Sequence, residues 1–251
     1  MGKSKKITRH IPNFITSLNL FSGSIATVLA FEGYLTYAAA FVVLASVFDF
    51  FDGMSARLLK VISPMGKELD SLADLISFGF APSVILYSLL KQIIFPGIQM
   101  DLSNIQFSQI LILLSPFLIA IFSGLRLAKF NVDERQTSSF IGLPTPANAL
   151  LIVSLPIILS CNNYSNIQSL ILNIYVLIPL IFIQSYLLIA EFPMFSFKFK
   201  NLKFSDNKIR FIFIVFVIAL FIIFKLAAIP LAIFMYVIFS AVNNWIIPKN
   251  K

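Results

Sequence analysis

The sequence predicts an all-α, polytopic integral membrane bundle of about eight transmembrane helices. Of its 251 residues, 59% are hydrophobic and only 12% are charged, and the mean hydropathy is +0.92. Such a composition is typical of membrane proteins and excludes a soluble domain. No polar segment is long enough to fold alone, so we expect one membrane domain over 1–251. A basic juxtamembrane segment, 1–12, would be followed by helices within 13–161 that carry an aspartate motif at 49–74, and by additional transmembrane helices within 162–251.

Apolar runs long enough to cross a bilayer define the expected helices. The first run follows a basic segment without a convincing signal-peptide cleavage site, so it is expected to stay as a helix. Pro64 and Gly66 mark the turn between the second and third helices. Two runs, 144–161 and 209–225, are short for a membrane span. In chain order the expected helices are 14–31, 36–60, 70–95, 107–129, 144–161, 168–190, 209–225 and 227–247.

Positive charge is distributed unevenly among the expected loops. Of 19 Lys and Arg residues, only Lys91 and Lys225 fall on the side opposite the termini. Because Lys and Arg accumulate in cytoplasmic loops, both termini are expected in the cytoplasm. The same rule explains the net charge of +8 without a nucleic acid partner. The single cysteine, Cys161, excludes an internal disulfide, and the single histidine, His10, excludes a histidine-cluster zinc site.

Four aspartates lie close together in this apolar sequence: Asp49, Asp52, Asp70 and Asp74. Ionisable groups at membrane depth are costly and therefore usually functional. Spacings of three and four residues place each pair on one face of its helix, and a short turn would bring the two pairs together in an antiparallel hairpin. Clustered carboxylates bind divalent cations. We therefore expect a metal site near the cytoplasmic ends of these helices.

Small and basic residues surround the aspartates. Gly53 and Gly66 would let a ligand approach the backbone, Ala56 keeps the face of Asp52 open, and Arg57 provides a guanidinium suited to phosphate. Together these features indicate a phosphorylated ligand, and the membrane location indicates a lipid. The aspartates could instead pair with Arg57 or line an ion pathway. Composition alone therefore leaves an enzyme and a divalent-cation transporter equally open.

The spacing of the motif favours the enzyme. The pattern Asp-x2-Asp-Gly-x2-Ala-Arg-x8-Gly-x3-Asp-x3-Asp is matched at every fixed position from Asp49 to Asp74. On this motif the chain is identified as a member of the CDP-alcohol phosphotransferase family. The resemblance implies transfer of a phosphoalcohol unit from a CDP-linked donor to an acceptor hydroxyl, with CMP leaving.

The resemblance also implies roles for individual residues. Two divalent cations, Mg²⁺ or Mn²⁺, would be held by Asp49, Asp52, Asp70 and Asp74. Asp74 would in addition be the general base. The segment that begins at Pro12 would line the nucleotide pocket together with the motif. The residues implied to bind the CDP-linked lipid donor are Pro12, Asn13, Thr16, Gly53, Ala56, Arg57, Ser63 and Gly66.

Further stretches resemble the bacterial phosphatidylserine synthase branch of the family, namely 11–23, 69–82, 126–131 and 142–147. This branch implies CDP-diacylglycerol as donor, L-serine as acceptor, a homodimer among membrane lipids, and an active site facing the cytoplasm from a bacterial inner membrane. Glycerol 3-phosphate or an inositol compound stays open as the acceptor. Lys129 stands where the branch has arginine. The residues considered for serine binding are Arg126, Lys129, Asn131 and Ser77.

Overall fold

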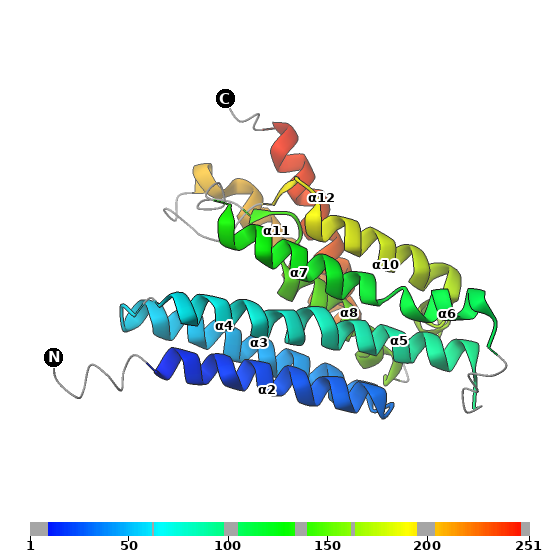
Figure 1. Ribbon diagram of the computed structural model, residues 1–251. Helices are drawn as coiled ribbons and strands as arrows, with labels where there is room; N and C mark the ends of the chain where they lie inside the picture. Colours follow the sequence, from blue (N-terminus) through cyan, green and yellow to red (C-terminus); the bar gives the residue numbers. More distant parts are fainter. Residues whose placement is uncertain are drawn as a thin grey trace.

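The computed structural model describes residues 10–61, 63–97, 105–133, 140–161, 164–194 and 204–246. These residues form a bundle of long apolar helices, with one pair of two-residue strands as the only departure from all-α structure among them (Figure 1). The polytopic all-helical membrane class is therefore confirmed. The basic residues expected before position 10 and within 195–203 lie outside the described part of the chain.

The first two helices form a tightly packed antiparallel hairpin. Helix α2 spans Ile11–Phe31 and helix α3 spans Leu35–Leu58. They are joined through Gly33, whose φ of +84° favours glycine. Small buried side chains between membrane helices let the backbones approach closely. In this hairpin they include Ala26, Ala30, Ala38, Ala39 and Ala45.

Helix α4 (Pro64–Asp74) continues through the π-helix η1 (Leu75–Phe80) into α5 (Ala81–Ile94). The expected start at residue 70 and the expected turn at Pro64 and Gly66 are wrong, because Pro64 is already the first helical residue. The Ser63 hydroxyl accepts a hydrogen bond from the Gly66 amide at 3.0 Å, which caps the helix, and proline is favoured at the first helical position. The turn therefore lies between Leu58 and Pro64.

The expected helix 107–129 is divided into α6 (Phe107–Leu114) and α7 (Phe117–Val132). The break falls at Ser115 and Pro116, where proline cannot continue the hydrogen-bond ladder. The expected helix 168–190 is likewise two helices, α9 (Ser165–Ile171) and α10 (Ile174–Ile189), bent by 66°.

Between these pairs lies α8 (Thr145–Leu159), a shorter apolar helix. Just before it, β1 (Phe140–Ile141) pairs antiparallel with β2 (Pro193–Met194), which follows α10. The Leu143 amide also donates to the Leu187 carbonyl at 2.8 Å. These main-chain contacts fix the beginning of α8 against the end of α10.

The last two helices, α11 (Phe204–Phe224) and α12 (Ala228–Ile246), fold back on each other through the 3-10 turn η3 (Lys225–Ala227). The Phe213 ring lies 5.6 Å from that of Phe239, as an antiparallel pair requires. By length and composition, five stretches of the described chain can cross a membrane, or six if α9 and α10 form one bent span. One of the five, Asn207–Val242, contains this reversal.

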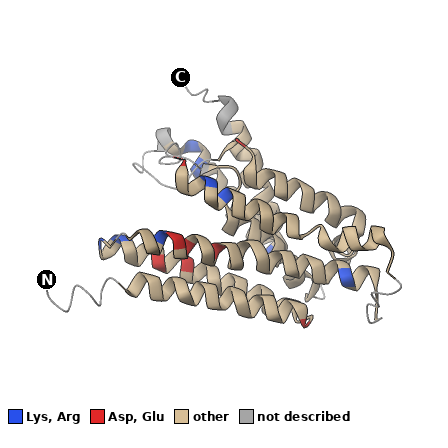
Figure 2. Cartoon of the chain, in the orientation of Figure 1, with Lys and Arg blue, Asp and Glu red and all other residues tan. Residues whose placement is uncertain are grey.

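Most charged residues of the described chain gather at one end of the bundle (Figure 2). The exceptions include Glu32 at the end of α2, Lys91 in the last turn of α5 and Lys225 in η3. Two contacts define that end. Lys67, near the start of α4, donates to the Asn131 carbonyl at 2.7 Å. Lys129, in the last turn of α7, forms an ion pair of 2.8 Å with Glu191 beyond α10. The four aspartates lie just inside this charged end.

Candidate active site

The hairpin formed by α3 and α4 brings the aspartates together. Carboxylate oxygens of Asp49, Asp70 and Asp74 lie within 4.8 Å of one another. Asp52, one turn after Asp49, is buried, and its Oδ2 atom has no hydrogen-bond partner among the described residues. The predicted convergence of two helical pairs is therefore present in the structure.

These carboxylates fit a divalent cation. Three oxygens so close together repel one another unless a cation or protons neutralise them. A buried carboxylate oxygen without a partner is itself costly, so the free Oδ2 of Asp52 also indicates a missing ligand. Carboxylate oxygens suit hard cations such as Mg²⁺ or Mn²⁺. The structure thus supports a metal site made by this group.

Asp74 is positioned from α2. The Asn19 side-chain amide donates to Asp74 Oδ1 at 3.3 Å, and the Ser77 hydroxyl donates to the Asn19 main-chain carbonyl at 3.0 Å. Both Asn19 and Ser77 are fully buried. Asn19 was not among the predicted site residues, because its contact depends on how α2 packs against the π-helix.

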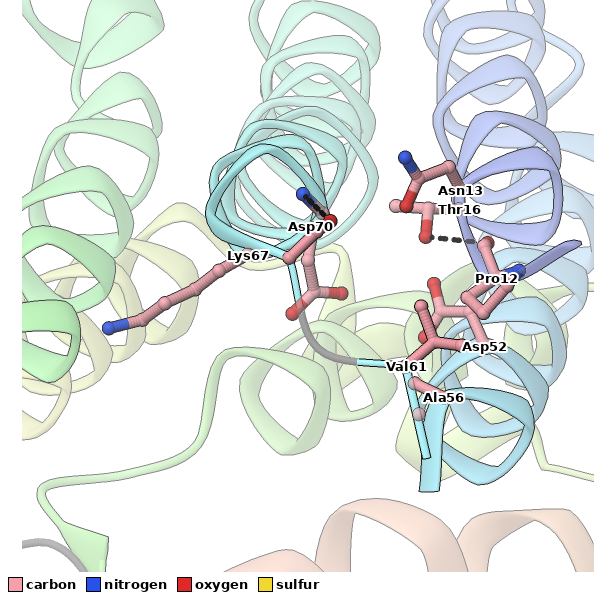
Figure 3. A pocket seen from close by; sticks show the side chains of 11 residues that line it. Pro12, Asn13, Thr16, Asp52, Ala56, Val61, Lys67 and Asp70 are labelled. Carbon is pink, nitrogen blue, oxygen red and sulfur yellow. Dashed lines mark hydrogen bonds between the residues drawn. The ribbon is translucent and has the colours of Figure 1, made fainter. Parts of the chain in front are cut away.

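A pocket opens beside the carboxylates, between α2 and the α3–α4 hairpin (Figure 3). Its volume is about 230 Å³. Asp52 and Asp70 lie on different walls and point toward the space between them. The lining residues are Pro12, Asn13, Thr16, Asp52, Gly53, Ala56, Val61, Ser63, Gly66, Lys67 and Asp70.

Seven of the eight residues implied to bind the donor line this pocket. The exception is Arg57, which is exposed and whose Nε donates to the Gly53 carbonyl at 3.0 Å. Val61 and Lys67 line the pocket without having been predicted. Val61 carries no chemical signal, and the Lys67 side chain extends away from the pocket toward α7 (Figure 3).

The two pocket glycines differ in their surroundings. A Cβ atom on Gly66 would lie 2.9 Å from Ser63 Oγ and 3.0 Å from Asn13 Oδ1. A Cβ atom on Gly53 would meet nothing within 4 Å. A side chain at position 66 would therefore have to displace the Ser63 and Asn13 side chains, whereas Gly53 leaves open space in the pocket.

The four residues considered for serine binding are placed differently. Arg126 is 7% exposed and interacts electrostatically with Asp74. Lys129 is paired with Glu191. The Asn131 amide donates to the Ser71 hydroxyl at 2.8 Å, and Ser77 is engaged with Asn19. Of the four, Arg126 is buried and interacts with Asp74 itself, whereas the buried Ser77 is linked to Asp74 through Asn19.

The sequence is similar to proteins whose names describe the transfer of lipid head groups. A family model described as CDP-alcohol phosphatidyltransferase matches residues 9–183. A CDP-diacylglycerol–serine O-phosphatidyltransferase of Helicobacter pylori (strain ATCC 700392 / 26695) is 31% identical over 238 residues, 92% of this chain and 90% of that protein. One of the same name from Bacillus subtilis (strain 168) is 37% identical over 146 residues, 58% of this chain and 75% of its own length. An archaetidylserine synthase of Methanothermobacter thermautotrophicus is 37% identical over 158 residues, 61% of each chain.

Proposed function

Because the chain belongs to the CDP-alcohol phosphatidyltransferase family, we propose that it synthesises phosphatidylserine. It transfers the phosphatidyl group of CDP-diacylglycerol to the hydroxyl of L-serine and releases CMP. The observation that carries this function is the pocket lined by the family motif, which opens directly onto the aspartate group. The relatives named as serine transferases, one of them matched along nearly its whole length, support serine as the acceptor.

Asp49, Asp52, Asp70 and Asp74 would hold two divalent cations, Mg²⁺ or Mn²⁺. When bound, such ions neutralise phosphate charge and stabilise the leaving group. This assignment is supported by the close approach of three carboxylates and by the unpaired oxygen of the fourth. The carboxylates themselves orient the group that they bind, because each is fixed on a rigid helix of the α3–α4 hairpin.

The pocket residues would hold the CDP part of the donor, with the acyl chains in the bilayer. Asn13, Thr16 and Ser63 provide polar groups, and Gly53 leaves room for the ligand. Arg57 follows the lining residue Ala56 and would reach the phosphates by rotating away from the Gly53 carbonyl, a rearrangement that its exposure allows.

In the transfer step, the serine hydroxyl oxygen attacks the phosphorus that carries the diacylglycerol. A new phosphorus–oxygen bond forms, the bridging pyrophosphate bond breaks, and CMP leaves with the bonding electron pair. Asp74 receives the hydroxyl proton as general base. Its buried position and the Asn19 hydrogen bond hold one oxygen in place and leave the other for the acceptor.

The arrangement in the membrane follows from charge. The end of the bundle that carries the aspartates also carries most of the basic residues (Figure 2), so we place it in the cytoplasm. The eight expected helices then correspond to α2, α3, α4–α5, α6–α7, α8, α9–α10, α11 and α12. We place the chain in a bacterial inner membrane as a homodimer, with 1–251 as one domain.

The test is CMP release by the purified chain with CDP-diacylglycerol and Mg²⁺ or Mn²⁺, with L-serine, glycerol 3-phosphate or inositol as acceptor. We expect release with serine alone, abolished by a chelator and restored by either metal. Release with a different acceptor would keep the chemistry and reject phosphatidylserine as the product. Ion flux without CMP release would favour the divalent-cation transporter.

A further inference from the structure

A second group of polar side chains is buried in the bundle without hydrogen-bond partners. Asn148 on α8 and Gln184 on α10 are 0% and 2% exposed, and neither the oxygen nor the nitrogen of either amide has a partner among the described residues. The same holds for the Thr145 hydroxyl and for Nε of Arg126 on α7. We call Arg126, Thr145, Asn148 and Gln184 the polar cluster.

The main-chain contacts place Asn148 and Gln184 at one level. Leu143, just before α8, is bonded to Leu187 in the last turn of α10. Gln184 lies three residues before Leu187, and Asn148 lies five residues after Leu143. At a rise of about 1.5 Å per residue, both amides are roughly one turn inside this crossing. Thr145 precedes Asn148 by three residues and shares its helix face.

Arg126 lies about one turn nearer the charged end than Gln184, and it interacts with Asp74. The Lys129–Glu191 ion pair sets the end of α7 against the end of α10, and these two helices run side by side (Figure 1). Arg126 is one turn inside that pair. It interacts electrostatically with Asp74 and with Tyr236 of α12. Tyr236 packs in a buried cluster with Leu143.

Such a group is unfavourable unless something binds there. Nearly all buried polar atoms in folded proteins are hydrogen-bonded, and an unpaired one destabilises the fold. Apolar residues of the same size would serve a purely structural role better. Buried polar residues without hydrogen-bond partners are expected at sites where a bound ligand supplies those partners.

The chemistry of the polar cluster matches a zwitterion. A guanidinium and two amide nitrogens can donate to a carboxylate, and two amide oxygens and a hydroxyl can accept from an ammonium. The cluster has a single formal positive charge, which suits one carboxylate but not the phosphate of glycerol 3-phosphate. Because Arg126 also interacts with Asp74, an amino acid held by the polar cluster would have its hydroxyl near the carboxylates.

We propose that Thr145, Asn148 and Gln184, together with Arg126, bind the amino-acid acceptor through its carboxylate and ammonium groups. The inference rests on the proposed function, because it names where the acceptor of that reaction sits. It adds α8 and α10 to the site, and it makes Lys129, Asn131 and Ser77 parts of the scaffold.

The test uses apolar variants of similar shape, Asn148→Leu and Gln184→Met. In the CMP-release assay we expect the KM for L-serine to rise about tenfold to a hundredfold, as for lost polar contacts to a substrate, with the KM for CDP-diacylglycerol unchanged. The thermal midpoint should stay equal or rise, because unpaired polar groups have been removed. The matched control is Ser154→Ala on α8, whose buried hydroxyl donates to Leu151 within its own helix. It should keep the wild-type KM for serine.

An unchanged serine KM in both variants would overturn the inference. If an apolar variant fails to fold, Thr145→Val removes a hydroxyl at constant shape and must raise the serine KM. A readout without turnover separates the inference from the proposed function. L-serine alone, but not ethanolamine, should raise the thermal midpoint of the wild type and not that of Asn148→Leu. If the wild type releases no CMP with serine yet shows this stabilisation, the function fails and the binding site stands; without stabilisation, both fail.

Discussion

Asp74 is held by a residue of another helix, and this explains how a buried carboxylate keeps one direction. Asn19 donates to one of its oxygens, and an Asp74 oxygen lies within 4.8 Å of oxygens of Asp49 and Asp70. An aspartate that carried only a metal could be replaced by asparagine with partial retention of function. A general base could not, because an amide does not accept a proton at neutral pH.

Asp74→Asn should therefore keep the fold and lose transfer. The amide oxygen can still accept the Asn19 hydrogen bond, so we expect an unchanged thermal midpoint and unchanged affinity for CDP-diacylglycerol. The kcat for CMP release should fall by about 10²–10⁴-fold, the usual contribution of general-base catalysis. Donor binding and initial rates measured on the same preparation check this. Wild-type turnover would remove Asp74 from the role of base.

The two pocket glycines should respond to alanine in opposite ways. At Gly66 the new methyl group would press on Ser63 and Asn13, so Gly66→Ala should lower the thermal midpoint and weaken the helix cap. At Gly53 nothing is within reach, and Gly→Ala inside a helix stabilises by about 0.5–1 kcal/mol. The measurement is the thermal midpoint of each variant, compared with the wild type in the same detergent. Equal destabilisation would contradict the packing argument.

At this scale the sequence predicted which motif residues lie together, but not the residues that support them. The aspartates and glycines were found because their spacing alone implies one helix face and one ligand. Nothing in the sequence around Asn19 or Gln184 indicates a function. An amide in an apolar helix is interpreted as a packed polar residue until its contacts in the structure are known. Arg57 was predicted in the pocket, but its side chain turns back to its own helix.

At the scale of helices, the active site depends on how closely α2 approaches the π-helix. Gly23 allows this approach, since a Cβ atom there would lie 2.6 Å from the Ser77 Cα atom. A π-helical turn inserts an extra residue into the helix and is often found at functional sites. Here the π-helix begins directly after Asp74, and its residue Ser77 donates a hydrogen bond to Asn19 on α2.

Gly23→Ala should separate α2 from the π-helix. Overpacking of this kind costs about 1–3 kcal/mol, and the Asn19 hydrogen bond to Asp74 should weaken with it. We expect a lower thermal midpoint and a lower kcat. The control is Gly124→Ala on α7, where a Cβ atom would make an ordinary contact of 3.5 Å with Leu75. If both variants behave alike, the close approach at Gly23 does not matter.

Helix limits could be predicted from hydropathy only where hydropathy changes at the limit. The expected 36–60 corresponds to Leu35–Leu58. The start of α4 was missed by six residues, because its first turn is polar and is fixed by the Ser63 cap and not by an apolar run. The break at Pro116 was hidden because apolar residues continue on both sides of it.

At the scale of the whole molecule, charge orders the bundle. The α7–α10 ion pair and the Lys67–Asn131 contact both lie at the end that carries the aspartates. A soluble amino acid would have to reach the carboxylates from this end, because the opposite end is separated from them by the length of the apolar helices. The orientation in the membrane therefore decides which compartment supplies the acceptor.

Single-cysteine labelling should reveal that orientation. In a Cys161→Ser background, Met65→Cys introduces a thiol at a residue that is 72% exposed in the first turn of α4, and Glu32→Cys introduces one at the exposed turn between α2 and α3. A membrane-impermeant maleimide applied to spheroplasts should label Glu32→Cys directly and Met65→Cys only after permeabilisation. This result follows if the basic end is cytoplasmic. The reverse pattern would place the carboxylates at the outer face of the membrane, away from an acceptor that arrives from the cytoplasm, and it would contradict the proposed topology.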